Sequence, residues 1–233
     1  MLPYNRRMKP SPARTTLVST LAAALSISVV SAQDPSIEKL LKKLPPPEQV
    51  VRADPASQDP LSKQITNAAK AQNFGQALDL SRRLAQRYPK SAGAQASHAI
   101  LAFQLRRFDE AADAFRKTIA IQPDLAFGYF GLGAVEFVRG HFAAAMPHFR
   151  RSVQLEPRAA LGWMFLGACA ERLGRKQDSL DYAKRGTSAN PGLAVTWIQL
   201  ARAEGALGHQ REAIAAMKRA QQISPAKKGQ KQR

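Results

Sequence analysis

Apolar side chains recur along most of this chain at the three- and four-residue intervals of amphipathic helices. Between residues 126 and 159, one such stripe runs from Tyr129 to Glu136 and a second from Phe142 to Phe149. The dipeptide Arg139-Gly140 separates the two stripes. Helical periodicity on both sides of a polar residue and a glycine predicts two amphipathic helices joined by a tight turn.

The same arrangement returns at a fixed period, which prolines mark. Five prolines follow one another at intervals of 34 residues: Pro89, Pro123, Pro157, Pro191 and Pro225. A proline ends a helix because its ring fixes φ and it cannot donate the next backbone hydrogen bond. A period of this length therefore predicts a solenoid in which one helix-turn-helix unit is copied and stacked. Frames that place each proline at position 32 are 58–91, 92–125, 126–159, 160–193 and 194–227.

Residue types agree from frame to frame. Position 4 is aromatic in three frames, positions 8 and 20 are small, and position 24 is large in three frames. The residues are Tyr129, Trp163 and Trp197 at position 4; Ala99, Gly133, Gly167 and Ala201 at position 8; Ala77, Ala111, Ala145, Ser179 and Ala213 at position 20; and Phe115, Phe149 and Met217 at position 24. With leucine at position 7 of the last three frames, this pattern resembles the tetratricopeptide repeat (TPR) family. The resemblance covers residues 58–225 and implies an all-α fold, a right-handed α-solenoid of five repeats.

Residues 1–32 have the features of a secretory signal. Basic residues precede an apolar run from Leu17 to Val30, and Val30-Ser31-Ala32 has the small side chains of a cleavage site. The run is short for a membrane-spanning helix, which needs about 20 apolar residues. We therefore expect export to the periplasm or the medium after cleavage, with an uncleaved membrane anchor as the alternative.

Residues 33–57 are rich in proline and charged residues, a composition typical of a linker. Within them, Ser36–Leu44 places its four apolar side chains on one helical stripe before Pro45 stops it. Nine residues are too few for a stable isolated helix, so this segment either frays, docks on a partner or docks on the solenoid. At the other end, residues 226–233 form a basic tail too short for a further helix.

The formal net charge of the chain is +18, which favours association with anionic surfaces. This gives a second function hypothesis, a basic surface that binds anionic envelope polymers or membrane headgroups. The alternative is that Lys and Arg simply solvate the outer helical faces. We expect no nucleic-acid partner, because no aromatic residues are interleaved with the basic ones.

Candidate chemistry is sparse. Cys169, the single cysteine, falls in a first helix and is expected to be a buried structural thiol. His98 takes a core position, where we expect a hydrogen-bonded interior histidine, and His141 and His209 fall in turns. Asp109-Glu110 has the position of helix N-terminal charges that complement the dipole. Because no metal-ligand, nucleophile or phosphate-binding motif is present, we expect no enzyme activity, no cofactor and no metal.

The resemblance also implies where a partner would bind. In this family the first helices of successive units line a concave groove, into which positions 2, 5, 9 and 12 point. Carried over to this chain, these positions are mostly apolar or aromatic, with an arginine in the last frame. The residues expected to form the peptide-binding groove are Phe103, Phe127, Phe130, Phe137, Leu161, Met164, Ile198 and Arg202.

The resulting function hypothesis is an exported TPR scaffold or adaptor that holds an apolar or amphipathic segment of a partner protein. Phe127, Phe130 and Met164 are its expected anchors, exposed to solvent in the free protein. The lysines and asparagines with which one TPR subclass binds a terminal carboxylate are absent here. Two alternatives stay open: some aromatic rings pack within the superhelix, or the Ile37–Leu44 stripe itself fills the groove.

Overall fold

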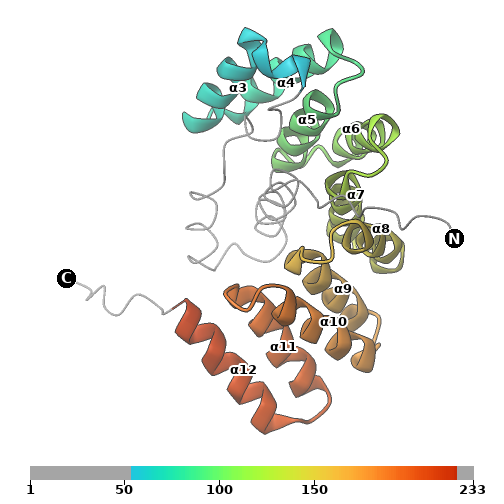
Figure 1. The fold of residues 1–233 in the computed structure, drawn as a ribbon, viewed down its shortest axis with the longest axis vertical. Coiled ribbons are helices and arrows are strands. Elements are labelled where there is room, and N and C mark those ends of the chain that lie inside the picture. The colour runs from blue at the N-terminus through green and yellow to red at the C-terminus, as the bar shows by residue number, and fades with distance from the viewer. Residues whose placement is uncertain (1–53, 225–233) are drawn as a thin grey trace, which may run out of the picture.

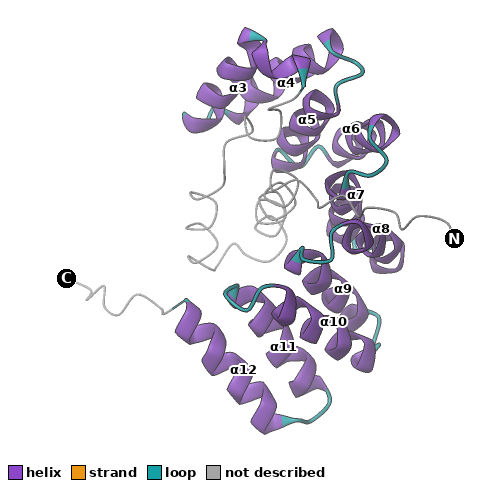
Figure 2. Cartoon of the chain, viewed as in Figure 1, coloured by secondary structure: helices purple, strands orange, loops and turns teal. Residues whose placement is uncertain are grey.

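The structure, a computed structural model, describes residues 54–224, and within this range every regular element is a helix (Figures 1 and 2). The elements in chain order are η2 (Pro55–Gln58), α3 (Pro60–Lys70), α4 (Phe74–Arg87), α5 (Ala92–Gln104), α6 (Phe108–Ile121), α7 (Ala126–Val138), α8 (Phe142–Leu155), α9 (Ala160–Arg172), α10 (Lys176–Ala189), α11 (Ala194–Ala206) and α12 (Gln210–Ile223). The expected all-α class is confirmed.

The helices pack as pairs, and the pairs stack in chain order. α3 packs on α4, α5 on α6, α7 on α8, α9 on α10 and α11 on α12, and each second helix also packs on the first helix of the next unit. Figure 1 shows the pairs following one another around an arc, from α3 and α4 at one end to α11 and α12 at the other. The five expected helix-turn-helix units are therefore all present.

The second helix of every unit ends two residues before the repeat proline. α4, α6, α8 and α10 end at Arg87, Ile121, Leu155 and Ala189, and the prolines at 89, 123, 157 and 191 follow. A residue that precedes proline is disfavoured in the α-conformation, which places the boundary at this point. Pro147 is not a repeat proline and does not end a helix: it lies inside α8, which continues past it to Leu155.

The turn inside each unit contains one residue with positive φ, always at position 15. In the last three units that residue is glycine, whereas the first two units have Gln72 at φ 59° and Arg106 at φ 60°. Left-handed backbone costs a side-chain-bearing residue about 1 kcal/mol or more, and glycine adopts it without that cost. The turn geometry is thus common to all five units, and two of them carry strain.

Replacing Gln72 with glycine is expected to raise the free energy of unfolding by about 0.5–1 kcal/mol, because strain relief exceeds the entropy that glycine adds to the unfolded chain. Urea denaturation followed by circular dichroism measures the change. The reciprocal variant Gly140→Gln should lower stability by about the same amount, since Gly140 has φ +81° and free space around it. A Gln72→Gly variant that is no more stable than the wild type would contradict the strain.

Small residues allow close contact between the two helices of a pair and between neighbouring pairs. The position-20 alanines Ala77, Ala111 and Ala145 have no exposed surface. A Cβ atom on Gly133 would lie 2.8 Å from the Phe149 ring, and one on Gly131 would overlap the Phe115 ring. Small residues therefore lie where the helices approach one another most closely.

Gly131→Ala is therefore expected to lower the free energy of unfolding by about 1–2 kcal/mol. The added methyl group meets the fully buried Phe115 ring, and this overpacking outweighs the gain of about 1 kcal/mol in helix propensity. Gly75→Ala is the matched control, because Gly75 lies in α4 with no atom within 4 Å of the new methyl group. It should be stabilising. If both variants shifted the stability in the same direction in thermal or urea unfolding, the result would contradict close packing at Gly131.

The folded part begins before the first repeat frame. Asp54 accepts a hydrogen bond from the amide of Ala56 and caps η2, and Ala56 is fully buried. Residues 54–57 therefore belong to the folded body and not to the linker, contrary to the expected boundary at residue 57. The signal, the Ser36–Leu44 segment and the tail at 226–233 lie outside the described residues.

Candidate functional site

The first helices of the units form the inner side of the arc. α5 contacts α7, and α9 contacts α11. Figure 1 shows α5 and α7 on the concave side and their partners α6 and α8 on the convex side. Repeat geometry thus provides the inner surface on which the sequence places a binding groove.

The predicted groove residues divide into a buried set and an exposed set. Phe103, Phe127 and Phe130 have no exposed surface, and Phe137, Leu161 and Met164 keep only 8%, 5% and 5%. Ile198 is half-buried and Arg202 is exposed. The expectation that Phe127, Phe130 and Met164 are solvent-exposed anchors is therefore corrected: these side chains are part of the packed interior.

Contacts between aromatic rings explain much of this burial. Phe130 meets Phe149 and Phe165 edge-on at 5.5 and 5.6 Å, and Phe149 stacks on Phe165 at 5.2 Å. Phe137 contacts Phe165 at 5.2 Å, and Phe127 contacts Phe115 at 5.7 Å. These rings join α7 and α8 to α9 and fill the space between the units. These phenylalanines therefore pack within the superhelix, which was the alternative left open by the sequence.

The inner face of α11, in the last unit, is more accessible than that of α7. Val195 and Ile198 are half-buried apolar side chains on α11, and Arg202 lies one turn beyond Ile198 on the same face. No carboxylate of the described residues pairs with Arg202. On α9, the carboxylate of Glu171 accepts a hydrogen bond from Nε2 of Gln199 at 2.9 Å, and the Arg172 guanidinium lies 5.2 Å from the centre of the Phe142 ring. This end combines apolar contact area with positive charge.

Sequence comparison agrees with the repeat geometry. A family model described as tetratricopeptide repeat matches residues 63–126 and 130–194, and a second with the same description matches residues 194–227. Together these ranges cover more than half of the chain. The protein belongs to the tetratricopeptide repeat family. No curated protein is similar enough to count as a match.

Several solved TPR-like structures share the fold. "MamA 41-end from Desulfovibrio magneticus RS-1" is 13% identical, with a TM-score of 0.64 over 77% of this chain and 100% of that one. TTC0263, a thermophilic TPR protein of Thermus thermophilus, is 18% identical, with a TM-score of 0.58 over 71% and 90%. YrrB, described as a TPR protein with an unusual peptide-binding site, is 17% identical, with a TM-score of 0.57 over 75% and 90%. At these identities the similarity shows the fold alone.

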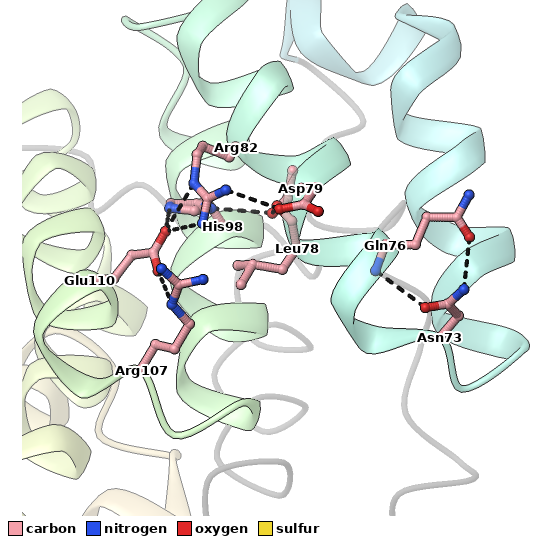
Figure 3. Close-up of polar contacts among 9 residues, drawn as sticks. Asn73, Gln76, Leu78, Asp79, Arg82, His98, Arg107 and Glu110 are labelled. Carbon is pink, nitrogen blue, oxygen red and sulfur yellow. Dashed lines mark hydrogen bonds and ion pairs between the residues drawn. The ribbon is translucent and has the colours of Figure 1, made fainter.

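A polar cluster joins the first two TPR units (Figure 3). Arg82 on α4 donates to Oε1 of Glu110 on α6 at 2.8 Å, and Nε of Arg107 lies 2.6 Å from Oε2 of the same carboxylate. Nε2 of His98 on α5 lies 3.1 Å from Oε1 of Glu110, and Nδ1 of His98 lies 3.2 Å from Oγ of Ser81. The expected hydrogen-bonded interior histidine is confirmed at His98.

The cluster has the order of a nucleophile, a base and an acid, but its geometry excludes that use. Ser81, which would be the nucleophile, has no exposed surface, so no substrate can reach its hydroxyl. The carboxylate of Glu110 faces two arginines as well as the imidazole. We conclude that Ser81, His98 and Glu110 hold two units together.

Opposing effects set the protonation of this cluster. Burial lowers the pKa of His98. The negative charge of Glu110 acts to raise this pKa, and the positive charges of Arg82 and Lys117 act to lower it further. Burial acts to raise the pKa of Glu110, but the hydrogen bond from Arg82 and the charges of His98, Arg82 and Arg107 outweigh it, and the pKa is lowered. The favoured state is an ionised Glu110 beside a neutral His98.

The remaining candidate residues from the sequence are a cysteine and two histidines, and each has contacts typical of a structural role. Cys169 is fully buried, and burial raises the pKa of its thiol to about 12, which agrees with a structural thiol. His141 and His209 each place Nδ1 beside a glutamate of the preceding helix, at 2.9 Å from Glu136 and 2.7 Å from Glu204. Within residues 54–224, no group of three or more metal-ligating side chains comes together, and no helix is long and apolar enough to cross a membrane.

Proposed function

We propose that this TPR protein is a scaffold that binds an amphipathic segment of a partner protein on the inner surface of its last two units. Membership of the TPR family supports a protein or peptide partner, and YrrB, which has the same fold, is described by its peptide-binding site. TPR proteins in general are scaffolds and not enzymes, in agreement with the absence of catalytic motifs in this sequence.

The observation that carries the proposal is the pair Ile198 and Arg202. The two side chains share one face of α11, one apolar and half-buried, the other exposed with no carboxylate partner among the described residues. Arginine is one of the residues enriched at binding hot spots, and the apolar side chain beside it adds contact area. A partner segment with an apolar side chain and a carboxylate about one helical turn apart would satisfy both.

We further propose that the protein acts outside the cytoplasm, because residues 1–32 have the order of a secretory signal. Edman sequencing of the protein isolated from its own cells tests this proposal. An N-terminus at Gln33 supports it, and an intact Met1 in the soluble fraction contradicts it.

The binding proposal is tested by quantitative pull-down with the wild type and matched variants. Ile198→Glu and Arg202→Glu should each weaken capture of the partner at least tenfold, the effect of losing a hot-spot residue. Ile214→Glu and Arg219→Glu introduce the same changes on exposed positions of α12 and should leave capture unchanged. A partner retained equally by all four variants would contradict the proposal.

A further inference from the structure

Two adjacent basic residues recur in every repeat, at positions 25 and 26 of the frame. They lie in the second helix of each unit and form five pairs: Arg82-Arg83, Arg116-Lys117, Arg150-Arg151, Lys184-Arg185 and Lys218-Arg219. Residues at the same repeat position face the same side of a solenoid, because each unit is stacked on the last in the same way. The five pairs therefore follow one another along the second helices, from α4 to α12.

Position 25 is partly neutralised by carboxylates, whereas position 26 is not. At position 25, three of the cations have a carboxylate partner: Arg82 with Glu110, Arg116 with Asp113 and Lys184 with Glu204. At position 26, all five side chains are exposed, and none pairs with a carboxylate of residues 54–224. We call these five the position-26 row: Arg83, Lys117, Arg151, Arg185 and Arg219. The aspartates one turn earlier contact other side chains: Asp79 contacts Arg82, Asp113 contacts Arg116 and Asp181 contacts Gln177.

Two members of the row are held in place before any ligand binds. The guanidinium of Arg151 lies 5.8 Å from the centre of the Tyr129 ring, and that of Arg185 lies 5.1 Å from the centre of the Trp163 ring. Nε1 of Trp163 in turn donates to the carbonyl of Pro157 at 2.8 Å. Stacking on a ring leaves the N–H groups at the edge of a guanidinium free to donate. Less side-chain entropy is therefore lost when an anion binds.

The shape of the row distinguishes between kinds of anionic partner. Figure 1 shows α6 and α8 on the convex side of the arc. A first helix packs on the second helix before it and on the one after it. Neighbouring helices lie about 8–10 Å apart, so successive members of the row are about 10–20 Å apart. A flat membrane surface would touch only the middle of such a convex row, whereas a flexible chain can follow it through all five units.

We propose that the position-26 row binds a linear phosphate polymer along the outer side of the solenoid. The planar fork of arginine matches phosphate oxygens, and Lys117 adds a point charge. Each neutralised phosphate releases a condensed counterion, so the affinity grows with the number of units in contact with the polymer. Phe115 and Phe149, which precede two of the pairs, are fully buried and offer no ring on which a base could stack. These features favour a chain of the polyphosphate type over a nucleic acid.

The row and the proposed partner site are separate, since Ile198 and Arg202 lie on α11 and the row lies on the second helices. Arg219→Glu and Arg202→Glu change the charge of the protein equally and distinguish the two proposals. Arg219→Glu should weaken polyphosphate binding and leave partner capture unchanged, whereas Arg202→Glu should do the reverse. Failure of one proposal therefore leaves the other standing.

Fluorescence anisotropy with end-labelled polyphosphate, recorded at several salt concentrations, measures the contribution of the row. Five contacts at about 0.7 each predict a slope of about −3.5 when the logarithm of the wild-type affinity is plotted against the logarithm of the salt concentration. The variant Arg83→Gln/Lys117→Gln/Arg219→Gln should flatten this slope by about 2 and lower the affinity at least tenfold at about 0.15 M salt. None of these three side chains contacts an aromatic ring or a carboxylate of the described residues, so the variant should fold.

The matched control is Lys70→Gln/Arg158→Gln/Arg175→Gln, which also removes two arginines and one lysine, from exposed positions outside the row. Its net charge equals that of the row variant. Its affinity should stay within about threefold of the wild type, because charges farther from the polymer than a Debye length of about 8 Å are screened. Equal losses for the two variants would show that binding follows net charge alone, and the proposal would then be wrong.

Two other ligands test the shape of the site. Tripolyphosphate carries the same groups but can reach only one unit, so it should bind at least tenfold more weakly than the long chain. Vesicles of phosphatidylcholine and phosphatidylglycerol should also bind more weakly than polyphosphate at the same concentration of phosphate groups. Equal affinity for tripolyphosphate, or tighter binding to the vesicles, would overturn a linear polymer as the ligand.

Discussion

Replacing Phe165 with alanine is expected to lower the free energy of unfolding by about 4 kcal/mol. The ring is fully buried and contacts three others, Phe130, Phe137 and Phe149, at 5.2 to 5.6 Å. Removing a buried phenylalanine costs about 3–5 kcal/mol, because transfer energy is lost and a cavity remains. In a solenoid each repeat contacts only its neighbours, so the lost stability comes from the interface between two adjacent repeats. Here that interface joins the third and fourth units.

This location predicts how the variant unfolds as well as how stable it is. With the third–fourth interface weakened, α9 to α12 should exchange their amide hydrogens faster than α5 to α8. The difference between these two sets of helices should be larger in the variant than in the wild type. Phe108→Ala is the control, since Phe108 is half-buried with one ring neighbour, Phe103 at 5.5 Å. It should cost about 2 kcal/mol or less. Equal losses for the two variants in urea unfolding would show that the ring cluster is not the principal contact between these units.

The helix pairs were predictable because each copy carries the same local signals. Proline at position 32 limits the second helix, and glycine at position 15 turns the chain in the last three units. The first two units make the same turn with Gln72 and Arg106, which no local rule favours there. Their conformation follows from stacking on the neighbouring unit, so the positive φ could be found only by comparison with the other frames.

Repeat position predicts the direction of a side chain but not its depth. Phe130 and Ile198 both occupy position 5, yet the phenylalanine is buried and the isoleucine is half-buried. Phe130 reaches Phe165 of the following unit, whereas α11 has no further helix pair beyond it within the described residues. The candidate site moves for this reason from the middle of the array to its last two units.

Two polar features were missed, for different reasons. Asp54 lies in a proline-rich stretch, but aspartate followed by proline is also the signature of a helix start, as Asp54-Pro55 and Asp59-Pro60 both prove to be. Glu110 was placed correctly in the first turn of a helix. Its contact between the first two units was missed, because it depends on Arg82, which lies 28 residues earlier. Contacts between units require knowing how the units stack.

The largest polar effect is expected for Glu110→Gln, which should lower the free energy of unfolding at pH 7 by about 2 kcal/mol. Hydrogen bonds to charged groups contribute about 1.5–3 kcal/mol, and the side chain of Glu110 keeps 21% exposure, so solvent screens part of the interaction. Because the folded-state pKa of Glu110 is lowered, its contribution is complete above the unfolded pKa of about 4.5 and disappears as the pH falls through the folded value. Wild type and variant should therefore converge in urea unfolding at acidic pH.

Asp109→Asn is the matched control that separates the cluster from the helix dipole. Asp109 shares the first turn of α6 with Glu110, but its side chain is 99% exposed and pairs with Arg139 across the neighbouring unit. Its loss should cost less than about 1 kcal/mol. In Glu110→Gln the pKa of His98 should fall further, because the charge that opposes burial is gone, and NMR titration of the imidazole measures this shift. Equal costs for the two variants with an unchanged His98 titration would mean that Glu110 acts only on the dipole, and that Arg82, His98 and Arg107 do not form one unit with it.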